Sequence, residues 1–323
     1  MFWFVVIILC VFTTVQAQFV TTSTFNVGSD PQGIAIDGSG NVWVANLGSD
    51  TVIKLSSTGT TLGTFTVGRN PVGIAIDGTG NVWVANEEDS TVTKLSSTGS
   101  ALGTFAVGVG PIGIAIDGNE NVWTANNGYG TVTKLSSNGN KLGTFNVGSY
   151  PEGIAIDGNE NVWVASDTVT ELSSNGNTLG TFTVGSYAQG VAIDGNGDIW
   201  VTNSGDTITK LNSTGTTLGT FAVGNQPTGI AIDSTGNVWV TNSGSFEDTV
   251  TKLNNSGSTL SIFKVGDTPM GIAIDSTGNV WVTNSGDGTV TKLIFSATSA
   301  SPTISNGACS ACVLNLLFMR SLK

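Results

Sequence analysis

Two short runs of carboxylates are the residues whose type and spacing best suit a chemical role in this 323-residue chain. One run is Glu87, Glu88 and Asp89, and the other is Glu247 and Asp248. Hard divalent cations bind to clustered oxygen ligands. The two runs therefore predict a cation site, for which calcium is the candidate ion.

Aromatic residues occur in the same kind of segment. The three tyrosines of the chain are Tyr129, Tyr150 and Tyr187. Phe246 and Arg69, which is the single basic residue of these segments, accompany them. Aromatic rings supply stacking area, and neighbouring carboxylates accept hydrogen bonds from hydroxyl groups. These five residues predict a surface that binds a glycan or an extracellular protein.

Three interpretations of these segments stay open. They form a solvated acidic rim that keeps the protein soluble, a binding face, or a cation site with or without hydrolytic activity. The carboxylates involved are Asp30, Asp50, Glu87, Glu88, Asp89, Glu152, Asp167, Asp206, Glu247, Asp248, Asp267 and Asp287.

Composition excludes several function classes. The chain has no histidine, so it holds no Ser-His-Asp or Cys-His catalytic set, and the lone pair Cys309 and Cys312 makes a poor zinc site. A net charge of −12 disfavours nucleic acid and anionic membrane surfaces, which need clustered Lys and Arg. The run Asp194–Asp198 has the carboxylate spacing of part of a calcium loop, but it recurs with other residues in every repeat, so we interpret it as a hairpin turn.

All these candidate site residues lie within seven copies of one sequence pattern, which determines where they are placed. The pattern is T-F-x-V-G-x-x-P-x-G-I-A-I-D-x-x-G-N-V-W-V-x-N…T-V-T-K-L-x-x-x-G. The copies begin at Thr24, Thr64, Thr104, Thr144, Thr181, Thr220 and Ile262. Repeats of about forty residues with turn signals between short β-rich runs are typical of propeller blades.

Four strands separate within each copy. In the first copy we expect them at Gly33–Asp37, Asn41–Asn46, Thr51–Ser56 and Leu62–Val67. The first two are nearly continuous apolar runs, as expected for strands that are covered on both faces. The sequence therefore predicts an all-β, seven-bladed propeller with four antiparallel strands per blade.

The ends of the repeat array predict how the ring closes. The first copy opens with a fourth-type strand at Thr24–Val27, and the last copy stops after its third strand at Leu293. The N-terminal strand can therefore complete the last blade and remove an open edge.

Variation between the copies concentrates in two loops. The inter-blade loop leads from V-G to P-x-G, and the mid-blade loop connects the second strand to the third. In a propeller both lie on the same surface, here called the loop face. Positions that are free to differ are where a specific surface can arise.

The motif P-x-G-I-A-I-D-x-x-G-N-V-W-V resembles the repeats of NHL-type propellers, most closely those of the streptogramin lyase (virginiamycin B lyase) group, from about Thr24 to Leu293. The resemblance implies the propeller fold. Enzymes of that group are metal-dependent lyases that rely on histidine, so no catalytic residue can be carried over to this chain. A non-catalytic binding or scaffold protein is the favoured function, and a metal-dependent lyase or lactonase is the alternative.

The two ends of the chain predict its location. Residues 1–17 have the apolar run and the small-x-small cleavage site of a signal peptide, ahead of a propeller at 18–294 and a Ser/Thr-rich, disordered tail at 295–323. We therefore expect a secreted, extracellular monomer (periplasmic in a Gram-negative bacterium) that does not stay in the membrane after cleavage.

Overall fold

The computed structural model describes residues 18–244 and 248–297. The expected signal peptide and the Cys309–Cys312 pair of the tail lie outside the described residues. Residues Val20–Phe295 form one compact unit. Across the described ranges, no helix has the length and apolar character needed to cross a membrane.

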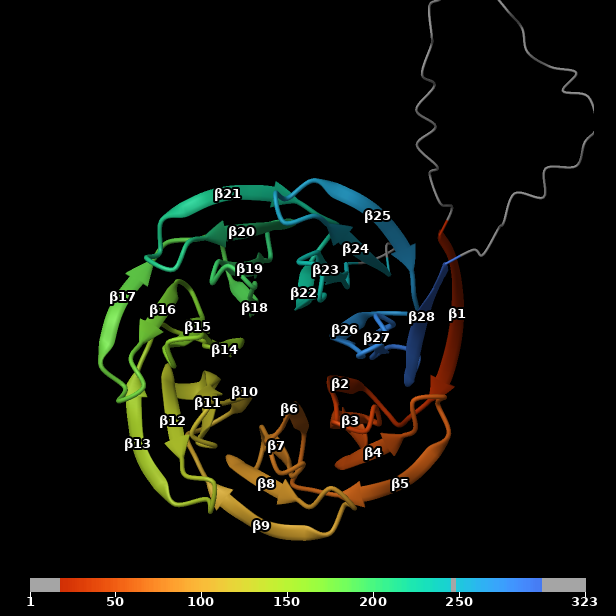
Figure 1. Ribbon diagram of the computed structural model, residues 1–323. Helices are drawn as coiled ribbons and strands as arrows, with labels where there is room; N and C mark the ends of the chain where they lie inside the picture. Colours follow the sequence, from red (N-terminus) through yellow and green to blue (C-terminus); the bar gives the residue numbers. More distant parts are fainter. Residues whose placement is uncertain (1–17, 245–247, 298–323) are drawn as a thin grey trace, which may run out of the picture. The chain divides into compact units, whose positions relative to one another are not determined.

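The compact unit is a seven-bladed β-propeller, as the repeat predicts (Figure 1). Each blade is one antiparallel sheet of four strands. Blade 1 has the strand order β2-β3-β4-β5, blades 2 to 6 repeat that order, and blade 7 has the order β26-β27-β28-β1. The first strands surround the centre of the ring and the fourth strands form its perimeter (Figure 1).

The first strands are β2 (Pro31–Ile36), β6 (Pro71–Ile76), β10 (Pro111–Ile116), β14 (Ile154–Ile156), β18 (Ala188–Ile193), β22 (Pro227–Ile232) and β26 (Pro269–Ile274). The second strands are β3 (Val42–Asn46), β7 (Val82–Asn86), β11 (Val122–Asn126), β15 (Val162–Ala165), β19 (Ile199–Asn203), β23 (Val238–Asn242) and β27 (Val280–Asn284). The third strands are β4 (Thr51–Leu55), β8 (Thr91–Leu95), β12 (Thr131–Leu135), β16 (Val169–Leu172), β20 (Thr207–Leu211), β24 (Thr249–Leu253) and β28 (Thr289–Ala297). The fourth strands are β5 (Thr61–Thr66), β9 (Ala101–Ala106), β13 (Lys141–Asn146), β17 (Thr178–Phe182), β21 (Thr217–Ala222), β25 (Thr259–Lys264) and β1 (Gln18–Asn26). Two short 3-10 turns, η1 (Leu47–Ser49) and η2 (Asn127–Tyr129), lie in mid-blade loops.

The N-terminal strand closes the ring, which confirms the expected closure. The red β1 lies beside the blue β28 in Figure 1. The N–H of Val27 donates to the carbonyl of Gly288 over 3.1 Å. Phe25 stacks on Trp281 with ring centroids 5.7 Å apart, which matches the 5.6 Å between Trp43 and Phe65 inside blade 1.

The core lies between neighbouring blades. The wholly buried Trp43 of blade 1, for example, packs in a cluster with Val82, Val84 and Leu95 of blade 2. Because each second strand is covered on both sides, its residues are buried without alternation. This is why Val-Trp-Val reads as a continuous apolar run.

Convergence at the centre explains the glycine that follows each P-x. A Cβ built on Gly113 would overlap the backbone carbonyl of Glu152 in the next blade, and the six equivalent glycines face the same obstacle. The inner strands can therefore approach each other only without side chains at this position.

A polar network fixes the opposite end of each blade. The indole Nε1 of each core Trp donates to the Asp that directly follows the first strand, over 3.0 to 3.1 Å in all seven blades. In blade 5 this Asp is Asp194, whose Oδ1 also accepts from the backbone of Asn196 and Asp198. The Asp194–Asp198 run is therefore a hairpin turn between β18 and β19, as interpreted from the sequence.

Most strand bounds of blade 1 lie within one residue of the expected ones. Larger differences occur at three strand ends, one of which is the start of β1 at Gln18 rather than Thr24. The first strand of blade 1 begins at Pro31 rather than Gly33, because Pro31 already pairs with Asn46 across a register shift. The last strand, β28, continues to Ala297, past the expected boundary at residue 294. There Phe295 packs on Trp239 and Phe263, at centroid distances of 5.3 and 5.6 Å.

Candidate functional site: the loop face and the channel mouth

The inter-blade and mid-blade loops share one end of each blade. Pro31 at the start of β2 pairs with Asn46 at the end of β3, so the loop before Pro31 and the loop after Asn46 are neighbours. The N–H of Leu47 donates to the carbonyl of Asp30, and the same contact recurs between Glu87 and Asn70. The two loop sets therefore form one surface, as expected for the loop face.

The backbone of this surface is under strain. The last residue of every inter-blade loop has a positive φ, and in blades 4 and 5 this residue is a tyrosine, Tyr150 at 53° and Tyr187 at 49°. The residues at the seven positions are Asp30, Asn70, Gly110, Tyr150, Tyr187, Gln226 and Thr268. A large side chain in this left-handed region costs about 1–2 kcal/mol, so both tyrosines persist at the expense of stability.

Many of the loop-face carboxylates bind backbone groups. Asp50, Asp206 and Asp248 accept hydrogen bonds of 2.9 to 3.1 Å from the backbone N–H of the next inter-blade loop. Asp167 and Asp287 accept similar bonds, of 3.1 and 2.7 Å, from Ser149 and Asp267. These carboxylates therefore tie neighbouring loops of the loop face together.

The structure joins the predicted cation run to Arg69. The Arg69 Nη1 lies 2.6 Å from Glu88 Oε1, and its Nε lies 2.7 Å from Asp89 Oδ1. Asp89 also accepts from the backbone N–H of Arg69, and these hydrogen bonds lower the pKa of Asp89. Contact with Asp89 in turn raises the pKa of Arg69. The predicted basic contact, Arg69, is thus paired with two of the predicted cation ligands, Glu88 and Asp89.

Half of the second predicted cation run and one predicted aromatic contact lie outside the described residues. Phe246 and Glu247 lie outside the described residues, and Asp248 binds the N–H of Thr268. Within residues 18–244 and 248–297, no three or more His, Cys, Asp or Glu side chains gather in a way that could hold a metal ion. The expected cation site on the loop face therefore stays a prediction.

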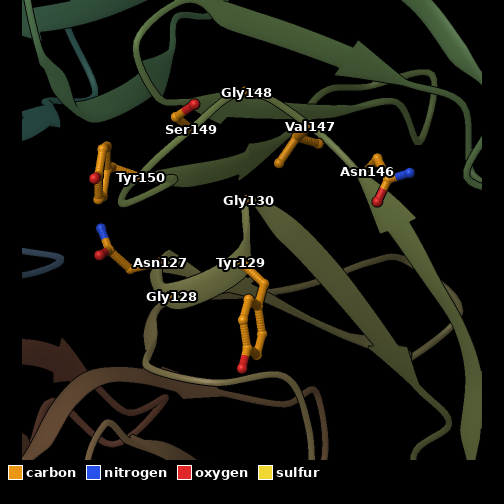
Figure 2. Close-up of a pocket in the computed structure, with 9 residues that line it drawn as sticks. All are labelled: Asn127, Gly128, Tyr129, Gly130, Asn146, Val147, Gly148, Ser149 and Tyr150. Carbon is orange, nitrogen blue, oxygen red and sulfur yellow. The ribbon is translucent and has the colours of Figure 1, made fainter.

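Two of the three tyrosines adjoin one hollow. Tyr129 in η2 and Tyr150 in the next inter-blade loop line an open cavity of about 380 Å³ (Figure 2). Figure 2 shows Tyr150 and Asn127 facing each other at one end, and Asn146 of the outer strand β13 at the other. The Tyr129 ring points away from Tyr150. Tyr187, 68% exposed, lies in the following inter-blade loop.

A second cavity, of about 230 Å³, lies where the first strands converge. Besides the packed glycines, seven residues line this cavity, one from each blade. Each is the x of the P-x-G motif, in which Ala replaces Pro in blade 5. These residues are Gln32, Val72, Ile112, Glu152, Gln189, Thr228 and Met270. Because the first strands begin at the loop face, this ring of seven side chains forms the mouth of the central channel. We call it the channel ring.

Glu152 is the charged member of the channel ring. Burial, and secondarily the negative charge of Glu87, raise the pKa of Glu152. Glu87, the third member of the predicted cation run, thus acts on the channel mouth instead of joining Glu88 and Asp89 around Arg69. Perturbed carboxyl groups in a concave site are candidates for function.

Sequence reasoning placed Glu152 among the acidic loop residues but missed the channel ring. A signal was present: in P-x-G-I-A-I every position is nearly invariant between the copies except x. Strand alternation could not show that x faces the channel, because neighbouring blades cover both faces of each inner strand.

Comparison with known proteins identifies the fold. No protein-family model matches the chain, and a comparison with curated proteins finds no match. A solved streptogramin B lyase superposes with a TM-score of 0.78 at 18% identity, over 86% of this chain and 98% of the enzyme. Virginiamycin B lyase from Staphylococcus aureus gives 0.77 at 16% identity, over 85% and 99%.

Two further structures complete the comparison. A catalytically inactive histidine-to-alanine variant of the S. aureus enzyme, with quinupristin, gives the same values. Hydrazine synthase from Kuenenia stuttgartiensis gives 0.74 at 14% identity, over 84% and 96%. At such low identity the likeness shows the seven-bladed fold alone.

Proposed function

We propose that this chain is a non-catalytic carbohydrate-binding propeller that takes a terminal sugar at the channel mouth of its loop face. One observation carries the proposal. The channel ring holds six residue types at seven equivalent positions, whereas the glycine that follows each is invariant. The fold needs the glycine in every blade, but it does not need Glu152 in one blade and Met270 in another.

The chemistry of the ring suits a sugar. The amides of Gln32 and Gln189 and the carboxyl of Glu152 can donate to and accept from hydroxyl groups, while Val72 and Met270 offer apolar contact to a sugar face. The cavity is smaller than the roughly 300–1,000 Å³ typical of pockets for drug-sized ligands. A single terminal sugar residue is therefore the matching ligand.

Tyr150 supports the same proposal. It directly precedes Pro151 and Glu152, its side chain is 64% exposed, and its backbone is strained. Strain that persists in a loop is a reason to look for function there. In the bound state the aromatic ring of Tyr150 would stack on the sugar that follows the terminal one.

Secretion is part of the proposal. It rests on the apolar run and cleavage pattern of residues 1–17, which predict export of the propeller. An extracellular glycan would then be accessible to the loop face.

We do not extend lyase activity to this chain. The solved relative is described as catalytically inactive once a histidine is changed to alanine, and this chain has no histidine at any position. In the described part of the chain, no group of three or more His, Cys, Asp or Glu side chains is placed to hold a metal ion.

A glycan array followed by calorimetric titration of the full chain tests the proposal. Glu152→Ala and Gln32→Ala each remove a polar contact, and we expect them to weaken binding about 10-fold or more. Tyr150→Ala should weaken it similarly. Tyr129→Ala is the matched control, because its ring points away from Tyr150, and it should bind like the wild type.

The proposal fails if no glycan binds, or if the channel-ring variants bind as tightly as the wild type. Retention of an extracellular protein that is unaffected by glycosidase treatment would also overturn it, and would assign the loop face to a protein partner.

A further inference from the structure

Six blades hold a lysine ammonium at one position of the polar network. Each lysine lies in the third strand, with its Nζ 4.5 to 4.8 Å from the centroid of the Trp ring and 3.1 to 3.8 Å from the Asp that binds the indole. The six are Lys54, Lys94, Lys134, Lys210, Lys252 and Lys292. In six of the seven blades, a positive charge from a lysine side chain therefore lies beside this Asp and Trp.

The ammonium also bridges to the next blade. In five of the six blades Nζ donates to a backbone carbonyl there, over 2.7 to 3.0 Å. The acceptor is always three residues after the residue that holds the lysine position in the next blade. Lys134, for example, donates to the carbonyl of Ser174.

Blade 4 carries Glu171 at this position. Glu171 pairs with Trp163 in the sheet register, as Lys134 pairs with Trp123. It is 93% buried, since only 7% of its surface is exposed. The equivalent carbonyl in the next blade is that of Ser213, three residues after Lys210.

The hydrogen bonds of blade 4 change accordingly. In blade 3 the Asn121 side-chain amide donates to Asp117. In blade 4 the equivalent Asn161 amide donates to Glu171 instead, over 2.9 Å. Asp157, 9% exposed, keeps the backbone N–H groups of Asn159 and Asn161 and the indole of Trp163. It has no lysine to bind.

Charge balance points to a divalent ion. In blade 3 the charges of Asp117 and Lys134 cancel, whereas blade 4 has two buried carboxyl groups, Asp157 and Glu171, and no lysine at this position. Two carboxylates near each other and out of water are costly unless a cation compensates them. An ion of charge +2 restores the balance of blade 3.

We propose that blade 4 binds a hard divalent cation, calcium, between Asp157, Glu171 and the carbonyl of Ser213, at the position that lysine ammonium groups occupy in the other six blades. Carboxylate and carbonyl oxygens are the ligands calcium prefers, and water completes its coordination. The site lies at the end of the blade that holds the turn between its first and second strands, opposite the loop face. It is therefore separate from both the cation run at Glu87–Asp89 and the channel ring.

Calcium titration of the full chain tests the site. We expect one bound ion per chain by calorimetry, and a rise in Tm of several degrees at a calcium concentration of about 100 Kd. Terbium in place of calcium should luminesce on excitation of tryptophan, because Trp163 borders the site. Glu171→Lys recreates the residue of the other blades, so it should fold, be more stable than the wild type without calcium, and lose both responses.

Glu88→Gln is the matched control. It removes an acidic side chain of the loop face and should keep both responses. The proposal is overturned if Glu171→Lys responds to calcium like the wild type, or if Glu88→Gln abolishes the response. It is also overturned if no ion binds and the wild type instead gains stability over Glu171→Lys as the pH falls, which would mean that Asp157 and Glu171 share a proton.

Discussion

One buried arrangement explains why Asp and Trp recur in all seven blades and Lys in six of them. Burial alone would raise the pKa of Asp77, but hydrogen bonds from Thr79, Asn81 and Trp83 outweigh it and lower the pKa to about 2. Hydrogen bonds of the same kind lower the pKa of Asp37 and Asp275 to about 2. Hydrogen bonds also lower the pKa of Asp117, Asp194 and Asp233. Six of the seven blades thus favour the ionised form of this Asp, which links the stability of the ring to pH.

This linkage gives a prediction for Asp77→Asn. Because the folded pKa lies below the unfolded value near 3.9, the stabilisation is fully present above about pH 4 and is lost as the pH falls through 2. The variant should lose about 2 kcal/mol at pH 7, and the difference should shrink toward pH 2. Thermal unfolding of both proteins between pH 7 and pH 2 measures it, and a difference that is independent of pH would contradict it.

Glu152 shows the opposite linkage. Burial and the charge of Glu87 raise its pKa in the folded state, so folding is penalised as the pH rises above the unfolded value near 4.3. Glu152→Gln should therefore raise Tm at pH 7 and leave it unchanged below pH 4. Glutamine fits there, since Gln32 and Gln189 hold the equivalent positions of blades 1 and 5. If the variant and the wild type had equal Tm values at pH 7, the Glu152 carboxyl would not reduce the stability of the fold.

At the scale of the element, the inter-blade loop ends in a left-handed residue in every blade. Asparagine tolerates this conformation better than tyrosine does, and Asn70 already holds the position in blade 2. Tyr150→Asn should therefore stabilise the protein by about 1 kcal/mol, or about 2–4 °C in Tm, while it weakens sugar binding.

The reverse substitution is the control for this effect. Asn70→Tyr should lower Tm by a similar amount, because it places the same strain in blade 2. Differential scanning calorimetry of the two variants checks both signs. If both variants lower Tm, the tyrosine at position 150 packs well in its loop and the strain argument is wrong.

Much of the element structure was predictable. The Gly-rich turns and apolar runs locate all four strands of a blade within about two residues, and Pro31 was missed because a bulge lets it pair with Asn46. The roles of the carboxylates were not predictable from composition. Asp50, Asp206 and Asp248 look like a free acidic rim until the structure shows them bound to N–H groups twenty residues along the chain.

At the scale of the molecule, closure depends on a strand far in sequence from its blade. A chain that begins at Pro31 lacks β1 and leaves the edge of β28 unpaired. Such an edge pairs with other chains, so we expect self-association and a lower, less cooperative thermal transition than for a chain that begins at Gln18. Size-exclusion chromatography with light scattering tests this; a monomer with unchanged Tm would mean that β1 does not close the ring.

The number of blades and their closure follow from the repeat, because each blade needs the same residues. The candidate sites depend on departures from the repeat, such as Glu152 in the channel ring and Glu171 among six lysines. A single sequence shows that these residues differ. It does not show that one faces the channel and that the other is buried beside Asp157.

The closing strand pair also determines how the propeller responds to force. The end of β1 meets the start of β28, where Val27 bonds to Gly288, so the two strands run antiparallel and residues 18 and 297 lie at the same end of the pair. Tension applied between these two residues would break the hydrogen bonds between the strands one after another, starting at that end. It would not load all the bonds at once in shear. Blade 7 would release first and at low force, so a propeller pulled by its two flanking segments would open its ring while the other six blades stayed folded.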